Sequence, residues 1–253
     1  MDSRAIIRAV INLLLPVSCV GCGEPDTQWC PHCQATPTRH HQPTLAWREA
    51  LWGIPVWAAV DHSGIWQRSI VSFKDRGAHR MSGPFGVLMA GLLERLALPA
   101  KQVVLLVPVP SSLGGWIARG TKPTLALAEA TLRAVLTTPS TTPQYSMAQS
   151  ALPRGRLAHF GGGFAVRQGL RRARGGVPLG QWLSPPHRRR RRTRSARLAQ
   201  PSRFVARSWL RGHPVILIDD VLTTGVTLEH AAAAVQRAGG VVVGALVLSA
   251  RSG

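Results

Sequence analysis

The chain has 253 residues, which is enough for one sizeable core and a small accessory module. Apolar residues make up 45% of it, an ordinary share for a globular protein, and no stretch is long and apolar enough to span a bilayer. Lysine and arginine number 31 against 11 acidic residues, so the formal charge is +20 and polyanionic ligands or nucleic acid are natural partners.

Residues 1–45 are predicted to form a separate N-terminal unit that begins with an amphipathic helix over residues 4–15. The same segment, followed by Cys19, faintly imitates a lipoprotein signal. Arg8 shortens the apolar core of that signal and Pro16 interrupts it. We therefore expect a helix packed on the body of a cytoplasmic protein.

All the cysteines lie in this unit as two C-x-x-C pairs separated by a short loop. They are Cys19, Cys22, Cys30 and Cys33. Such spacing can place four thiolates around one tetrahedral zinc ion, and four protein ligands make a zinc site structural. The alternative is a pair of disulfides, which is disfavoured because disulfides within C-x-x-C are mainly redox-active and nothing indicates an oxidising compartment.

Residues 46–253 alternate between apolar strand patterns and helix patterns, which predicts an α/β fold with a parallel sheet. The expected strands cover residues 56–60, 103–110, 215–218 and 241–248, and the expected helices cover residues 64–73, 84–98, 123–136 and 228–238.

The interval 137–212 differs from the rest because its periodicity is poor. No acidic residue occurs between Glu129 and Asp219, and residues 188–192 are five consecutive arginines. A segment this long is unusual as a connection within a compact domain. A mobile loop, an insertion or a reading-frame error would each explain it, and the arginines suit a solvated arm as well as a phosphate-binding one.

Residues 215–227 carry the most specific pattern: an apolar strand, the acids Asp219 and Asp220 where that strand is expected to end, then a short hydroxyl-rich loop before a helix. Free backbone N–H groups and the helix dipole make such a loop an anion site, and Gly225 permits a close wrap. No lysine follows the glycine, so the pattern is not a nucleoside-triphosphate P-loop. The residues predicted to hold a phosphate are Thr223, Thr224, Gly225, Val226 and Thr227.

This 13-residue segment resembles the phosphoribosyl-diphosphate (PRPP) motif of type I phosphoribosyltransferases. With the cysteine pairs, residues 70–77 and residues 107–112 followed by Arg119-Gly120, the chain resembles the ComF family, named for a role in DNA uptake during competence. The resemblance implies a type I phosphoribosyltransferase fold with an N-terminal zinc ribbon. It also implies that Asp219 and Asp220 hold the ribose hydroxyls of PRPP and that Mg²⁺ accompanies the diphosphate.

For the diphosphate itself, the resemblance points to the loop after the second core strand and to one cation near residue 74. The residues concerned are Pro110, Ser111, Ser112, Arg119 and Lys74. The chain departs from the family at residues 121–123, Thr-Lys-Pro, where an aromatic residue and an asparagine are common. Arg194, Arg197 and Arg203 are candidates for remnants of a flexible loop that closes over the substrate.

Two functions follow from this reading. The first is an enzyme that transfers ribose-5-phosphate from PRPP to a nitrogen acceptor, which the sequence does not identify. The second is a non-catalytic PRPP or nucleotide sensor whose basic stretch binds single-stranded DNA through its phosphates. Competence-machinery proteins are the partners implied by the resemblance, and an acceptor pocket would distinguish the two functions.

Overall fold

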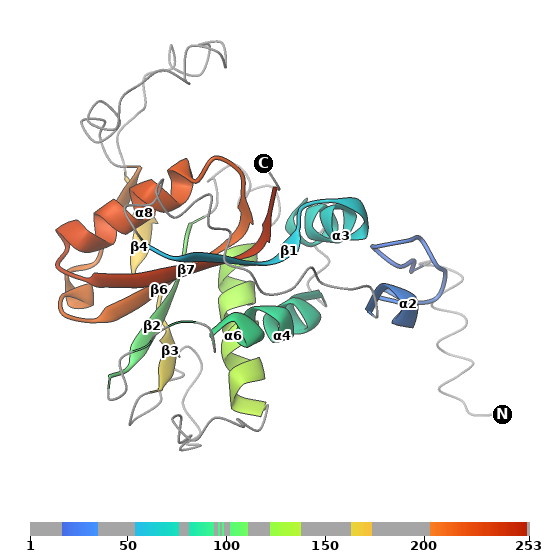
Figure 1. Ribbon diagram of the computed structural model, residues 1–253, viewed down its shortest axis with the longest axis horizontal. Coiled ribbons are helices and arrows are strands. Elements are labelled where there is room, and N and C mark those ends of the chain that lie inside the picture. Colours follow the sequence, from blue (N-terminus) through green and yellow to red (C-terminus); the bar gives the residue numbers. More distant parts are fainter. Residues whose placement is uncertain are drawn as a thin grey trace, which may run out of the picture.

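The computed structural model describes residues 17–34, 54–75, 81–93, 96, 98, 102–110, 122–137, 163–173 and 203–251. Its centre is a parallel five-stranded sheet in the order β1-β7-β6-β2-β3 (Figure 1). The predicted parallel α/β class is therefore confirmed. The strands are β1 (Val56–Asp61), β2 (Val104–Pro108), β3 (Phe164–Val166), β6 (Pro214–Leu222) and β7 (Val241–Ala250).

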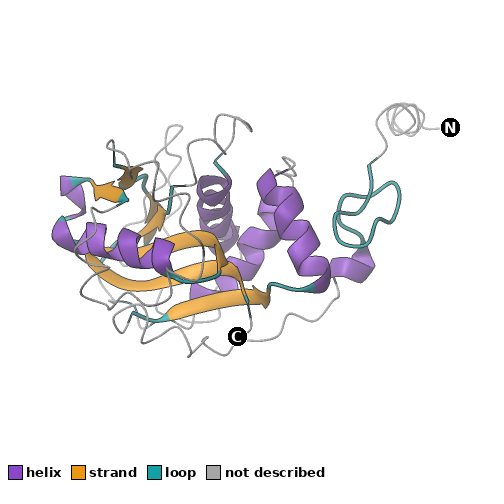
Figure 2. Ribbon diagram, turned by 90° about the horizontal axis from the view of Figure 1, so that it is seen from above, coloured by secondary structure: helices purple, strands orange, loops and turns teal. Residues whose placement is uncertain are grey.

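Helices cover both faces of this sheet (Figure 2). They are α3 (Gly64–Asp75), α4 (Ser82–Leu93), α6 (Pro123–Thr137) and α8 (Val226–Arg237), and the short α2 (Pro31–Gln34) lies in the cysteine-rich unit. Because adjacent strand residues point to opposite faces, Leu106 and Ile216 pack with α3, α4 and α6, whereas Leu105 and Leu217 pack with α8. Two cores result, and both faces of the central strands are dry.

The five strands are parallel, but the order in which the chain adds strands to the sheet changes direction between β2 and β6. From β2 the chain passes through α6 to β3 at one edge, and from β6 it passes through α8 to β7 on the other side. The two helices therefore lie on opposite faces. In open α/β sheets, ligands bind outside the carboxyl ends of the strands at such a topological switch point.

The described part of the interval 137–212, which was expected to be irregular, contains three short strands. Besides β3 at the sheet edge, β4 (Leu170–Arg172) and β5 (Phe204–Ala206) form an antiparallel hairpin, followed by the 3₁₀ helix η5 (Ser208–Leu210). Phe204 and Leu210 are buried in the core beneath α8. A three-residue strand is too short to show a period, so the sequence pattern could not reveal these elements.

Several predicted boundaries shift. Helix α4 ends at Leu93, five residues before the predicted end at residue 98. Helix α8 begins at Val226, two residues before the predicted start. Strand β6 continues to Leu222, so the two acids lie within the strand and do not follow it.

Some expectations concern residues outside the described ranges. These include the amphipathic helix over residues 4–15 and the arginine run at residues 188–192. Among the described helices, none has both the length and the apolarity needed to cross a bilayer.

The close approach of α4 and α6 depends on Gly86. A Cβ atom there would lie 2.5 Å from the carbonyl carbon of Ala130 and 2.6 Å from its oxygen. Gly86→Ala should therefore lower the free energy of unfolding by about 1–3 kcal/mol or more, measured by denaturant unfolding. Gly91→Ala on the same helix meets open space and should be neutral or stabilising by up to about 1 kcal/mol. Equal effects of the two substitutions would contradict this packing.

Candidate functional site

At the switch point the pairing of β6 with β2 ends before its pairing with β7, because the two rows of hydrogen bonds along β6 have different lengths. On one side, β6 pairs with β2 up to Ile218, where Val109 donates its N–H to the Ile218 carbonyl at 2.9 Å. On the other side, β6 pairs with β7 as far as Leu222. Residues 219–222 therefore extend beyond the carboxyl end of β2 within the described structure, and the two predicted acids lie on this extension.

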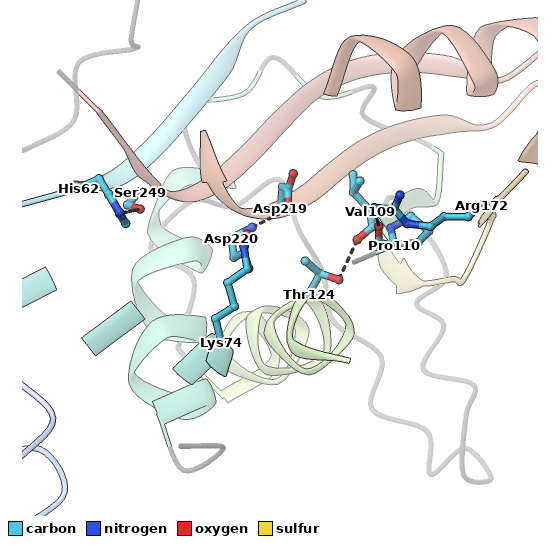
Figure 3. A network of polar contacts seen from close by, with 9 residues as sticks. All are labelled: His62, Lys74, Val109, Pro110, Thr124, Arg172, Asp219, Asp220 and Ser249. Carbon is cyan, nitrogen blue, oxygen red and sulfur yellow. Dashed lines mark hydrogen bonds and ion pairs between the residues drawn. The ribbon is translucent and has the colours of Figure 1, made fainter. Parts of the chain in front are cut away.

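Asp219 and Asp220 point to opposite faces of β6, as Figure 3 shows. This follows from the alternation of side chains along a strand. The two acids are still linked, because the Asp220 N–H donates to Asp219 Oδ1 at 2.9 Å. The pair thus offers one carboxylate to each face, in place of two side by side.

Asp220 is 3% exposed and forms an ion pair with Lys74 at the end of α3 (Figure 3). Lys74 Nζ donates to Oδ1 at 3.0 Å and lies 2.9 Å from Oδ2. The Oδ2 atom is buried and accepts no hydrogen bond from the described residues. A buried carboxylate without its cation would be strongly destabilising, so the Lys74 ammonium has a structural task in the protein without ligand.

Burial raises the pKa of Asp219 well above its ordinary value, and the nearby Asp220 charge raises it further. The Asp220 N–H and the Lys74 charge act in the opposite direction but do not cancel these effects. A carboxylate in this situation gains from any hydroxyl donor or cation that approaches it. The carboxyl end of β6 is therefore suited to a polyhydroxylated ligand or a divalent ion.

The loop after β6 has the predicted form. Thr223 and Thr224 are exposed, and Gly225 is buried with φ of 70°, in the left-handed region that favours glycine. Gly225 is the N-cap of α8, and no side chain caps that helix. Val226 and Thr227 form its first turn, so their N–H groups are among those that an α-helix leaves without an intrahelical partner. The loop and helix together have the geometry that suits an anion.

The carboxyl end of β2 lies beside these acids, where its pairing with β6 ends. Thr124 in the first turn of α6 donates its hydroxyl to the Val109 carbonyl at 2.8 Å. Arg172 Nη2 donates to the Pro110 carbonyl at 3.3 Å (Figure 3). Pro110 is therefore where it was predicted to be, at the start of the loop after β2. Ser111, Ser112 and Arg119 lie outside the described residues.

Arg172 lies at the candidate site, and the sequence reasoning did not predict it. It ends β4, its guanidinium lies 5.4 Å from the centroid of the Phe204 ring, and its charge interacts with that of Asp219. Burial and then Arg203 lower its pKa, but an arginine still stays charged at neutral pH. Nothing distinguished this arginine among its many neighbours, because only the β4–β5 hairpin brings it to the end of β2.

A histidine lies on the other side of the two acids, at the carboxyl end of β1. His62 Nδ1 lies 2.9 Å from the Oγ of the fully buried Ser249. Burial lowers the His62 pKa, as do the charges of Arg251 and Lys74, while Asp220 raises it. The imidazole is therefore neutral at pH 7.

The cysteine-rich unit brings all four predicted ligands together. The Sγ atoms of the four cysteines lie within 4.8 Å of one another, and none forms a disulfide. Zinc–sulfur bonds of about 2.3 Å in a tetrahedron place the sulfurs about 3.8 Å apart, so the cluster fits a four-thiolate zinc site. Cys19, Cys30 and Cys33 are buried and Cys22 is exposed. The predicted clustering is confirmed.

The environment of these thiols also favours a bound cation. Burial alone would raise the Cys19 pKa, but hydrogen bonds from the backbone of Cys30, Cys22 and Gly21 lower it to about 6. Burial and the neighbouring sulfurs raise the pKa of Cys33. Without a metal, such closely spaced thiols resist joint ionisation, and a dication removes that obstacle.

Comparison with protein-family models gave no match, and no curated protein matches the chain. The resemblance to the ComF family therefore rests on the motifs themselves.

The thiol cluster should carry stoichiometric zinc in protein purified under reducing conditions, as measured by elemental analysis. Cys33→Ser removes a buried ligand, so it should abolish zinc retention and open residues 17–34 to proteolysis. His32→Asn changes an exposed residue inside the second C-x-x-C pair and should leave the zinc in place. Protein without zinc, or loss of zinc in the His32 variant alone, would contradict a four-cysteine site.

His62 predicts a pH dependence of stability. Its folded pKa lies below the ordinary 6.5, so the unfolded chain takes up the proton first as the pH falls. The stability contributed by neutral His62 is thus present above about pH 6.5 and is lost as the pH falls through the folded pKa. His62→Asn should reduce the loss of stability between about pH 7.5 and about pH 5, measured by urea unfolding.

His230 on α8 provides a comparison, because burial and then Arg203 and Arg237 also lower its pKa. His230→Asn should remove a separate share of the same loss, so the double variant should show the flattest profile. A His62→Asn profile parallel to that of the unsubstituted protein would show that this histidine is not coupled to folding.

Proposed function

We propose that this protein is a PRPP-binding, Mg²⁺-dependent phosphoribosyltransferase of the ComF type. The observation that carries the proposal is the sequence of groups along β6 and α8. Two acids extend past the end of β2 and lead directly into a hydroxyl-rich loop at an uncapped helix N-terminus, at the switch point of a parallel sheet.

Each part of PRPP has a chemically suited group in this arrangement. The exposed threonines and the N–H groups at the start of α8 suit the 5′-phosphate. Asp219, whose carboxyl gains from a donor, suits the ribose hydroxyls. Asp220 is buried and paired with Lys74, so it would act on the ribose mainly through its hydrogen bond to Asp219.

The diphosphate would lie toward the end of β2. Arg172 supplies a cation there and is held by the Pro110 carbonyl, while Ser111, Ser112 and Arg119 remain candidates from the sequence. Lys74 was expected at the diphosphate, but its ion pair with Asp220 favours a different role. We propose that it neutralises the buried acid and leaves Asp219 as the more available carboxylate.

The donor set also fits Mg²⁺, which prefers oxygen ligands and binds through one or two carboxylates together with substrate phosphates. We would assign Asp219 to the Mg²⁺ ion, because a nearby cation would stabilise the charged form of this carboxylate. Bound with PRPP, the ion would neutralise charge that develops on the leaving diphosphate.

In the proposed reaction, the bond between ribose C1 and the diphosphate oxygen breaks with both electrons leaving on the diphosphate. A nitrogen lone pair of the acceptor then forms the new bond to C1, and the acceptor loses a proton. The transition state is oxocarbenium-like, so the protein contributes mainly positioning and charge stabilisation. The acidic end of β6 and the threonine loop would hold the ribose-5-phosphate, while Arg172 would stabilise the negative charge on the leaving diphosphate.

The alternative is a PRPP or nucleotide sensor that binds single-stranded DNA. Its nucleic-acid part rests on the arginines at residues 188–192, which lie outside the described residues, and a link to competence rests on the ComF resemblance alone. An enzyme should release diphosphate when PRPP, Mg²⁺ and a suitable nitrogen base are present, whereas a sensor should not.

Thermal unfolding tests the proposed site without knowledge of the acceptor. PRPP with Mg²⁺ should raise the melting temperature, because a ligand present at about 100 times its Kd stabilises the folded state by about 2.7 kcal/mol. Asp219→Asn should remove most of this shift while leaving the protein folded, since the residue is not in the Lys74 ion pair. The double variant Asp219→Asn with Asp220→Asn should also lose the shift, but it breaks the Lys74 ion pair, so its melting temperature without ligand should be lower.

Glu129→Gln is the matched control, because it neutralises a carboxylate in the middle of α6, outside the proposed site. It should leave the PRPP-induced shift unchanged. The absence of any shift in the unsubstituted protein, or a full shift in the double aspartate variant, would overturn the proposed function.

A further inference from the structure

Helix α3 connects the cysteine-rich unit, residues 17–34, with the carboxyl end of β6. Near its start, Trp66 and Arg68 contact the cysteine-rich unit. In its second half, Ile70 and Phe73 are buried in the core beneath the sheet. Near its end, Lys74 holds Asp220. The same helix therefore meets both the four cysteines and the proposed PRPP site.

The contact between α3 and the cysteine-rich unit is specific. Arg68 Nε donates to the Gly21 carbonyl at 2.7 Å. Gly21 lies between the two ligands of the first pair, and a Cβ atom on it would lie 2.8 Å from Cys33 Sγ. The carbonyl that receives Arg68 therefore belongs to the backbone that wraps the thiol cluster, and its position depends on that cluster.

A second contact is aromatic. The Trp29 ring lies 5.5 Å from the Trp66 ring and 6.5 Å from Phe85, and Phe85 in turn makes an edge contact with Phe73 at 5.4 Å. Trp29, Cys19, Cys30 and Cys33 belong to the same continuous apolar cluster as these rings. The cysteine-rich unit is thus part of one core, which a tethered independent module would not be.

The geometry of the ion pair makes it sensitive to the position of α3. Residues 66 and 74 are separated by about 12 Å along the helix axis, and an α-helix of that length moves as a rigid body. Lys74 must stay within 3.0 Å of a buried carboxylate. A shift of about 1 Å at the start of α3 would therefore be felt at the ion pair, where a lost partner is costly.

We propose that the four-cysteine unit is a positioning element of the PRPP site. Loaded with metal, it fixes α3 through Trp66 and Arg68, and α3 holds Lys74 on Asp220. Trp66 and Arg68 are positioning residues in this arrangement. The coupling concerns the chain alone, and only its consequence for PRPP affinity rests on the proposed function.

Hydrogen–deuterium exchange of the zinc-loaded full chain tests the coupling without any ligand. Arg68→Ala should raise exchange at residues 219–222 and in the last turn of α3 by about fivefold, the factor that corresponds to loss of one hydrogen bond. Zinc content should stay unchanged. Arg68→Lys, which keeps a donor, should restore part of the protection. Gln67→Ala, at the neighbouring exposed position of α3, should have no effect at residues 219–222.

A variant without the ion pair distinguishes coupling through Lys74 from a general increase in the mobility of the protein. In a background with Lys74→Met and Asp220→Asn, which removes the ion pair without leaving a buried charge, Arg68→Ala should no longer change exchange at residues 219–222, because the route through Lys74 is already broken. Exchange that increases only in residues 17–34 and the first turn of α3 would overturn the proposal. The same holds for an equal Arg68→Ala effect with and without Lys74.

PRPP affinity gives a second reading. If the unsubstituted protein binds PRPP with Mg²⁺, Arg68→Ala should raise the Kd several-fold with zinc retained, and Arg68→Lys should recover part of the loss. An unchanged Kd would show that the positioning does not reach the ligand. Absence of PRPP binding in the unsubstituted protein would overturn the proposed function but leave the exchange experiment as an independent test.

Discussion

The unequal pairing of the two sides of β6 is the constraint on which the site depends. Because the β2 ladder stops at Ile218 while the β7 ladder continues to Leu222, residues 219–222 are held rigidly by one neighbour and open toward the other. A strand end held in this way keeps Asp220 buried and leaves Asp219 half-buried. The order in which the chain adds strands reverses between β2 and β6, so the location of the candidate site follows from topology.

Charge around the carboxyl end of β6 is distributed in a way that suits an anionic sugar. The chain carries a net charge of +20, yet two of its few acids lie together at the centre of the sheet. Each acid has a basic neighbour on its own side, since Lys74 pairs with Asp220 and the Arg172 charge interacts with that of Asp219. A purely basic site would accept any polyanion. The acids add a requirement for hydroxyl groups or a metal ion, which inorganic phosphate does not meet as well.

The parts of this arrangement that were predicted from sequence are those encoded locally. The strand, acids and threonine loop lie within thirteen consecutive residues, and each C-x-x-C pair spans four residues. Their chemistry can therefore be predicted without knowledge of the fold. Contacts between residues far apart in the sequence could not be predicted. Lys74 and Asp220 are 146 residues apart, and Arg172 contacts Pro110 across 62 residues. The strands of the hairpin that carries Arg172 have three residues each, which is too short to show the alternation of apolar and polar residues that predicts a strand.

The size of the cysteine-rich unit explains why it is integrated into the body of the protein. Its described residues, 17–34, are too few to bury an independent core, and a unit this small normally needs a metal or a partner surface to fold. Here the thiol cluster offers a site for the first, and the Trp66 and Phe85 rings, against which Trp29 packs, supply the second. Since Phe85 also packs against Phe73, one residue before Lys74, the rings that anchor the cysteine-rich unit also brace the end of α3. A change that loosens either partner therefore removes support from the other.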